Sequence, residues 1–252
     1  MKLGLMQGRL LPPVRGHIQE FPPNWDEELV LVDRLGLVGV EWLATSHRFF
    51  INPILEKGTF NEFPIISVCM DNLVHRQIDD PVILETIIRS CYDAGVRRFT
   101  IPLLEESSMI SGERRNRFCN NMEAIGNMFS DAIFSFEAEL HPEHLAEIVY
   151  MCDNFRVTYD TGNTTSFGLD HVEYINRFTN RINNVHLKYR TFNAETVEPL
   201  TGDTDFETTF KALKSIGYDG NYVIQTARGD TGKEVETISN HMNIFRGIYD
   251  AV

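Results

Sequence analysis

Short apolar runs alternate with amphipathic stretches along the whole chain, and this alternation constrains the fold more than any other feature. Several runs are rich in Val, Ile, Phe and Tyr, and turn residues commonly bound them, which favours β-strands. Apolar residues in the intervening stretches recur with the period of an α-helix. We therefore expect strands at residues 2–9, 38–43, 64–70, 98–103, 133–140, 155–160, 183–189 and 221–226.

The helical stretches follow these strands one by one. We expect helices at residues 26–35, 82–94, 113–128, 143–152, 172–179, 206–216 and 234–249, with only a short, weak helical pattern at 52–58. Asn24 with Glu27, and Thr204 with Glu207, have the spacing of capping boxes. His141 and Pro142 read as an ordinary helix start. Arg114, Arg115 and Arg117 read as a solvated helix face.

The number of strand–helix units points to one fold class. Eight units in a chain of 252 residues match the count and size of a (β/α)8 barrel, the TIM barrel. A doubly wound sheet is the competing fold, but the G-x-G-x-x-G and phosphate-loop motifs that open many such sheets are absent from the sequence. No linker or low-complexity segment divides the chain. We expect a single TIM-barrel domain over residues 1–252.

Composition limits the classes of partner that the protein can bind and the cellular compartment in which we expect it. The chain has 23 Lys and Arg residues against 36 Asp and Glu residues, a net charge of −13. This acid excess disfavours nucleic acid, whose phosphates require a positive surface. No apolar run approaches the roughly 18 residues of a membrane helix. The four cysteines form no C-x-x-C pair. We therefore expect a cytoplasmic protein with reduced thiols and no nucleic-acid or membrane partner.

Polar residues at the strand ends indicate where chemistry occurs. In a TIM barrel the reacting groups come from the C-terminal strand ends and the loops after them. Glu137, Asp160 and His186 fall on successive strands at equivalent depth, and Gln225 adds an amide oxygen on the last strand. Such oxygen and nitrogen donors suit a divalent ion with open positions. Each residue alone could be a buried polar group satisfied by its neighbours, but their combination favours a metal site.

Six sequence words carry a resemblance to a known family. They are MQGRL at 6–10, FEAEL at 136–140, YDTGN at 159–163, VHLKYR at 185–190, VIQTAR at 223–228 and the segment 202–223. In this order they resemble the xylose-isomerase-like TIM barrels, also called the sugar phosphate isomerase/epimerase family. The resemblance runs over nearly the whole chain.

The resemblance implies a cofactor, a substrate class and roles for several residues. It implies one divalent ion (Mn, Mg, Co or Zn) held by Glu137, Asp160 and His186, with Gln225 at the fourth ligand position. It implies isomerisation or epimerisation of a small sugar or sugar phosphate, by proton transfer next to a carbonyl through an enediolate. Glu137 would be the base, and Lys188 a proton donor or a neutralising charge. The sequence leaves open whether the protein forms a homo-oligomer.

Further strand-end residues are expected to contact the substrate, namely Gln7, Arg9, Glu41, Glu105, Arg190 and Arg228. Arginine suits bidentate binding of phosphate or carboxylate. The alternative is that Arg9 and Arg228 pair with Glu41, Glu105 or Glu139. The choice between a phosphorylated and a free sugar stays open.

Gln225 departs from the family pattern, in which the epimerases carry a glutamate that is both metal ligand and second base. An amide can ligate a metal but cannot accept a proton, so single-base aldose–ketose isomerisation fits better than two-base epimerisation. A second hypothesis is a barrel that binds a sugar or a partner without turnover. A DNA-repair endonuclease of the related apurinic-site type is disfavoured, because Glu41 and Asp71 stand where it needs histidines.

Overall fold

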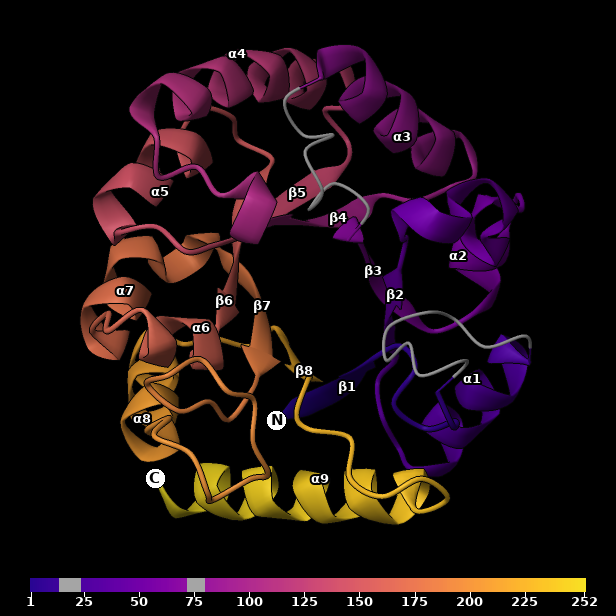
Figure 1. The fold of residues 1–252 in the computed structure, drawn as a ribbon, viewed down its shortest axis with the longest axis vertical. Coiled ribbons are helices and arrows are strands. Elements are labelled where there is room, and N and C mark those ends of the chain that lie inside the picture. Colours follow the sequence, from indigo (N-terminus) through magenta and orange to yellow (C-terminus); the bar gives the residue numbers. More distant parts are fainter. Residues whose placement is uncertain (14–23, 72–79) are drawn as a thin grey trace. The chain divides into compact units, whose positions relative to one another are not determined.

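Eight parallel strands follow one another in chain order around a closed barrel in the computed structural model, which describes residues 1–13, 24–71 and 80–252 (Figure 1). This confirms the predicted (β/α)8 class, and each observed strand overlaps a predicted one. The strands are β1 (Lys2–Met6), β2 (Val40–Leu43), β3 (Ile65–Cys69), β4 (Arg98–Leu103), β5 (Ile133–Ala138), β6 (Phe155–Asp160), β7 (Ile182–Leu187) and β8 (Asn221–Ile224).

The helices of the described residues alternate with these strands. They are α1 (Trp25–Arg34), α2 (Thr59–Glu62), α3 (Pro81–Asp93), α4 (Gly112–Met128), α5 (Pro142–Val149), α6 (Thr161–Ser166), α7 (His171–Phe178), α8 (Phe206–Ser215) and α9 (Glu234–Ala251). Short 3-10 turns lie at Ser46–Ile51, Pro53–Leu55, Glu105–Ser107 and Thr179–Arg181. The sequence did not predict α6, a single polar helix that begins directly where β6 ends.

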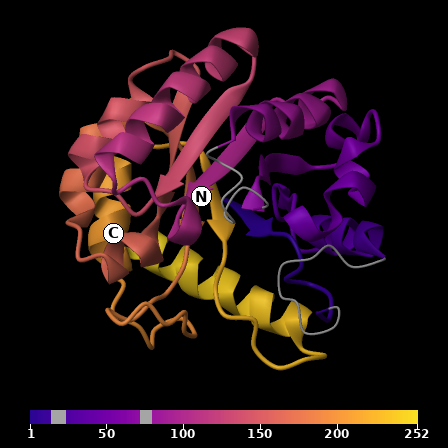
Figure 2. The same ribbon diagram turned by 45° about the horizontal axis from the view of Figure 1, so that its top comes forward.

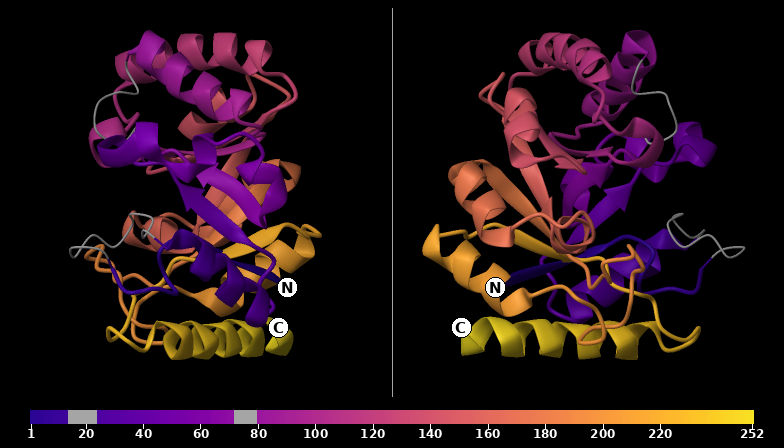
Figure 3. Two further views of the ribbon diagram at one scale, coloured as in Figure 1. Left: turned by 90° about the vertical axis from the view of Figure 1, so that its right-hand side faces the viewer. Right: turned by 60° about the vertical axis from the view of Figure 1, so that its left-hand side comes forward.

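The chain forms two compact units. The first unit comprises Met1–Glu41 and Tyr159–Val252. In it β1 pairs with β8 from Lys2↔Asn221 to Leu5↔Ile224, and β7 pairs with β8 on the other side. Helices α7 and α8 lie side by side (Figure 1). Helix α9 lies against the loop that precedes α8, as the views in Figure 3 show.

The second unit comprises Trp42–Thr158 and is built on a long strand pair. Strands β4 and β5 pair over six residues each, from Arg98↔Ile133 to Leu103↔Ala138 (Figure 2). Its core is aromatic: Phe134 stacks on Phe99, and Phe155 packs edge-on against Phe134 and Phe136. The expectation of a single domain over residues 1–252 stays a prediction.

Three local predictions differ from the structure, and for two of them the side chain has a tertiary partner instead. Thr204 does not cap α8; Asp205 does, accepting from the backbone N–H of Thr208, while Thr204 contacts the chain after β7. Asn24 is the N-cap residue of α1, as predicted, but its side chain makes no cap hydrogen bond and instead donates to the Glu27 carboxylate. Arg115 is buried rather than solvated, and its Nε lies 2.7 Å from Glu147 Oε2.

Among the described residues, no helix combines the length and the apolar character needed to cross a bilayer. All four cysteines are free thiols.

A matched pair of helical glycines tests the packing of the second unit. A Cβ on Gly126 of α4 would lie 2.6 Å from Phe155 Cε1, whereas a Cβ on Gly247 of α9 would meet nothing within 4 Å. We expect Gly126→Ala to lower the free energy of unfolding by about 1–3 kcal/mol, because the core must shift to admit the methyl group. Gly247→Ala should be neutral or stabilising by about 0.5–1 kcal/mol. Urea denaturation measures both, and equal effects would contradict the packing.

Candidate active site

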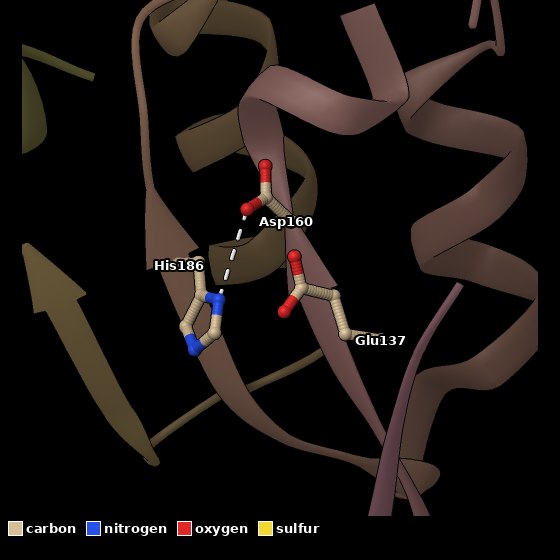
Figure 4. A group of neighbouring side chains, drawn as sticks. All are labelled: Glu137, Asp160 and His186. Atoms are coloured by element: carbon tan, nitrogen blue, oxygen red, sulfur yellow. Dashed lines mark ion pairs between the residues drawn. The ribbon is translucent and has the colours of Figure 1, made fainter. Parts of the chain in front are cut away.

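His186 lies buried between two carboxyl groups at the end of β7. Its Nε2 is 2.8 Å from Glu41 Oε2, and its Nδ1 is 3.7 Å from Asp160 Oδ2 (Figure 4). Strand alternation produces this arrangement, because residues two apart share a face and Asn184 and His186 therefore point the same way. Since a carboxylate can only accept, Nε2 carries the proton shared with Glu41. Nδ1 is the ring nitrogen that faces Asp160.

Glu41 on β2 orients this imidazole. Its Oε2 accepts from His186 Nε2 and also from Asn184 Nδ2, at 2.9 Å. The residue is fully buried, so both hydrogen bonds lie in a region of low dielectric where they are strong. A carboxylate that accepts from one ring nitrogen fixes the tautomer and leaves the other nitrogen to act as a ligand. The sequence assigned Glu41 to substrate contact; in the structure its Oε2 serves the histidine.

The two oxygens of Asp160 have separate partners. Oδ1 accepts from the backbone N–H of Asn163 at 2.7 Å and caps α6, while Oδ2 lies 2.8 Å from Lys188 Nζ. Burial raises the pKa of Asp160, but the charge of Lys188 and the contact with His186 more than offset burial and hold the pKa well below its usual range. Asp160 is therefore ionised at neutral pH, with Oδ2 directed at His186 and Lys188.

Thr161, which sequence reasoning missed, fixes the chain after β7. Its Oγ1 accepts from the backbone N–H of Lys188 at 2.9 Å and lies 3.1 Å from the carbonyl oxygen of His186. The hydroxyl ties the start of α6 to the end of β7, so that Asp160, His186 and Lys188 are held by one local network. A threonine after a strand gives no distinctive sequence signal, because its role depends on the neighbouring strand.

The loop after β1 is held by a second residue that sequence reasoning missed. The buried Glu28 carboxylate of α1 accepts from the backbone N–H groups of Gly8, Arg9 and Leu10 at 2.9, 2.9 and 3.0 Å. Burial raises the pKa of Glu28. The Arg228 guanidinium donates to the carbonyl oxygens of Gly8 and Leu11 from the other side. These contacts fix the segment that carries the buried side chains of Gln7 and Arg9.

A cavity of about 420 Å³ opens beside this cluster within the first unit. It is lined by Arg9, Lys188, Arg190, Thr196, Gln225, Thr226, Ala227 and Arg228. Burial and the neighbouring Arg228 lower the pKa of Arg9 to about 10, which leaves the guanidinium protonated at neutral pH. Gln225 is buried, and its Oε1 has no hydrogen-bond partner within the described ranges.

The structure thus gathers most of the residues that the sequence placed in the site. Asp160, His186 and Lys188 form one cluster with Glu41, and Arg9, Arg190, Gln225 and Arg228 line the adjoining cavity. Glu137 is buried on β5 in the second unit. Glu105 lies in the same unit, exposed, at the start of the turn after β4, with a left-handed φ of 51°.

The donor atoms fit a divalent ion. Glu137, Asp160 and His186 each offer a ligand atom of the type that such ions bind, and all three are buried. The 3.7 Å between Asp160 Oδ2 and His186 Nδ1 is near the separation of two ligands on one tetrahedral ion, about 3.4 Å for bonds of about 2.1 Å. The amide oxygen of Gln225, which has no partner among the described residues, is a hard donor of the kind that such an ion binds.

The chain is similar to one curated protein in sequence and to several solved structures in fold. An inosose dehydratase of Geobacillus thermodenitrificans (strain NG80-2) is 24% identical to this chain over 151 residues. The match covers 49% of this chain and 51% of the dehydratase, so the chain spans about half the length of this curated relative. The solved structure of a zinc-bound IolI protein has a TM-score of 0.74 at 16% identity, covering 100% of this chain and 99% of the other. A D-psicose 3-epimerase of Clostridium cellulolyticum H10, solved with D-tagatose, has a TM-score of 0.70 at 13% identity, with 99% of each chain covered.

The family itself is shown by sequence. Residues 71–246, more than half of the chain, match the profile described as xylose isomerase-like TIM barrel. The resemblance carried by the six sequence words is thereby confirmed. The chain belongs to the family of xylose isomerase-like TIM barrels.

Proposed function

We propose that this chain is a metal-dependent enzyme that moves a proton at the carbon next to the carbonyl of a sugar. The observation that carries the proposal is the buried His186, with Nε2 on Glu41 and Nδ1 facing the ionised Asp160. Similar proteins include a D-psicose 3-epimerase and an inosose dehydratase, and removal of a proton beside a carbonyl is chemistry that epimerases and dehydratases can share. The proposal commits to that common step.

Glu137 is proposed as the third metal ligand and as the base. Its neighbour Phe136 pairs with Val157 of β6, so the register places Glu137 opposite Thr158. Strand alternation puts Thr158 and Asp160 on the same face of β6. Because paired residues of parallel strands point to the same side, Glu137 is expected on the face of the barrel that carries Asp160.

The chemical roles follow from the side chains. When bound, a divalent ion polarises the carbonyl and stabilises the negative charge that develops on its oxygen. Glu137 takes the proton from the carbon beside the carbonyl, and the Lys188 ammonium, which lines the cavity, neutralises charge or donates a proton to the substrate oxygen. Gln225 cannot accept a proton, so Glu137 returns the proton on the same face. That course gives aldose–ketose isomerisation.

Gln225 also favours a second candidate function. A barrel that lacks the second base of the epimerases could bind a sugar ligand or a partner without turning it over. The two functions differ in proton exchange, which the binding protein lacks.

The metal site is tested by removing its ligands one at a time. We expect His186→Ala and Glu137→Gln each to lower the affinity for Mn²⁺ by more than about 100-fold, because outer contacts alone are worth about 10–100-fold. Matched controls on α5 are His144→Ala and Glu143→Gln, whose side chains are exposed and lie outside the cluster. Competition with a chromophoric chelator measures the affinity. Unchanged affinity in both site variants would show that the ligand assignment is wrong.

Glu41 is tested as the residue that orients His186. Glu41→Gln removes the negative charge that accepts from Nε2, so we expect Mn²⁺ affinity to fall about 10–100-fold while the fold is retained. The matched control is Glu198→Gln, because Glu198 pairs with His241 Nε2 at 3.0 Å in the same unit. The imidazole nitrogen shifts in NMR spectra should report a changed tautomer balance at His186 only in Glu41→Gln. Equal effects of the two substitutions would contradict the orienting role.

Proton transfer is tested by solvent exchange. We expect the Mn²⁺-loaded protein, incubated in D₂O with a panel of ketoses and ketose phosphates, to place deuterium on the carbon next to the carbonyl. Glu137→Gln should slow this exchange by about 100-fold or more, because the base is removed, whereas Glu143→Gln should not. Absence of exchange in the wild type and in Gln225→Glu alike would favour the protein that binds without turnover.

A further inference from the structure

Four cations line the cavity beside the cluster, and its lining residues within the described ranges include no acid. The cations are Arg9, Lys188, Arg190 and Arg228. The other lining residues that the structure describes are uncharged, namely Thr196, Gln225, Thr226 and Ala227. This concentration of positive charge stands in a chain whose net charge is −13. Its volume of about 420 Å³ lies within the range of small-molecule sites.

Three of these cations already have partners of different kinds. Lys188 Nζ lies 2.8 Å from Asp160 Oδ2, and Arg228 donates to the backbone carbonyls of Gly8 and Leu11. Among the described parts of the chain, the Arg190 guanidinium has only hydroxyl partners at long distances, Ser166 Oγ at 3.4 Å and Thr196 Oγ1 at 3.5 Å. Hydroxyl groups at those distances leave most of the guanidinium's hydrogen-bonding capacity for another acceptor.

Arg9 is the cation whose environment most needs an anion. The residue is 6% exposed, and its Nε is buried with no hydrogen-bond partner in the parts of the chain that the structure describes. The nearby Glu28 carboxylate offsets the charge of Arg9 only in part, and its oxygens accept the backbone N–H groups of residues 8–10. A buried guanidinium beside a second arginine is costly unless a negative group compensates it.

We infer that this cavity binds an anionic group of the ligand, a carboxylate or a phosphate ester, with Arg9 as the principal contact and Arg190 beside it. Two guanidinium groups match the oxygens of either anion, since each can donate two parallel hydrogen bonds. A neutral sugar hydroxyl would add no negative charge against the repulsion between Arg9 and Arg228, which Glu28 offsets only in part. That the anion belongs to the substrate rests on the proposed function, because Lys188 and Gln225 are shared by the cavity and the proposed reaction site.

The test uses three open-chain six-carbon ligands that differ in a terminal group: sorbitol 6-phosphate, with a phosphate on C6, gluconate, with a carboxylate at C1, and sorbitol, which is neutral. None has a carbonyl group, so none can react, and calorimetric titration with and without EDTA separates binding in the cavity from binding to metal. We expect the preferred anionic ligand to bind about tenfold or more tightly than sorbitol. Preference for sorbitol 6-phosphate identifies a phosphate-ester site, and preference for gluconate identifies a carboxylate site. Equal binding of all three ligands would overturn the inference.

Variants locate the site. Arg9→Gln should abolish the preference for the anion, a loss of about tenfold in affinity, whereas Arg246→Gln on the exposed face of α9 removes the same charge and should keep the preference. Arg190→Gln, which alters a half-buried side chain, should also weaken the preference for the anion. If Arg9→Gln misfolds, Arg190→Gln alone tests whether the cavity is the anion site. Equal losses in Arg246→Gln and in the cavity variants would overturn the assignment.

The two proposals fail separately. If the anion preference holds in a protein that neither binds Mn²⁺ nor exchanges deuterium, the proposed function fails and the anion site stands. If Mn²⁺ binding and exchange hold without any anion preference, the enzyme stands and the anion site is wrong.

Discussion

The hydrogen bond between Glu41 and His186 is the interaction on which the rest of the site depends. Both side chains are fully buried, so neither can exchange its partner for water without a large cost. The bond leaves Nδ1 facing Asp160, whose own position is fixed by its cap on α6. If Glu41, Asp160 and Lys188 carry their formal charges and His186 is neutral, these four residues have a net charge of −1. A bound cation would offset this negative charge, in line with the proposed metal site.

The surrounding chain holds this arrangement by hydrogen bonds that involve the backbone. Thr161 ties α6 to the end of β7, and Glu28 gathers three consecutive N–H groups of the loop after β1. Both contacts join segments of the first unit that are distant in sequence. They place the metal-ligand candidates and the cationic cavity next to each other, since Lys188 belongs to both. One unit therefore holds most of the proposed chemistry.

The sequence predicted the features that depend on period and strand position. Alternation within strands placed Asp160 and His186 correctly as buried strand-end residues, and the eight strands were found because apolar runs are local signals. Features that depend on tertiary partners were missed. Glu28 looks like an ordinary acid in the first turn of α1, Thr204 like an N-cap and Arg115 like a surface cation. Glu41 was predicted to contact the substrate, whereas in the structure it accepts from His186. The residues around Glu41 in the sequence carry no sign that His186 is its neighbour in space.

The most direct measurement is a crystal structure of the Mn²⁺-loaded protein with anomalous diffraction data collected at the manganese edge. The account predicts one strong anomalous peak between Asp160 Oδ2 and His186 Nδ1, with Glu137 as a further ligand and His186 Nε2 still on Glu41. A peak elsewhere, or no peak while His186 keeps both its carboxyl neighbours, would contradict the claim that this cluster is a metal site.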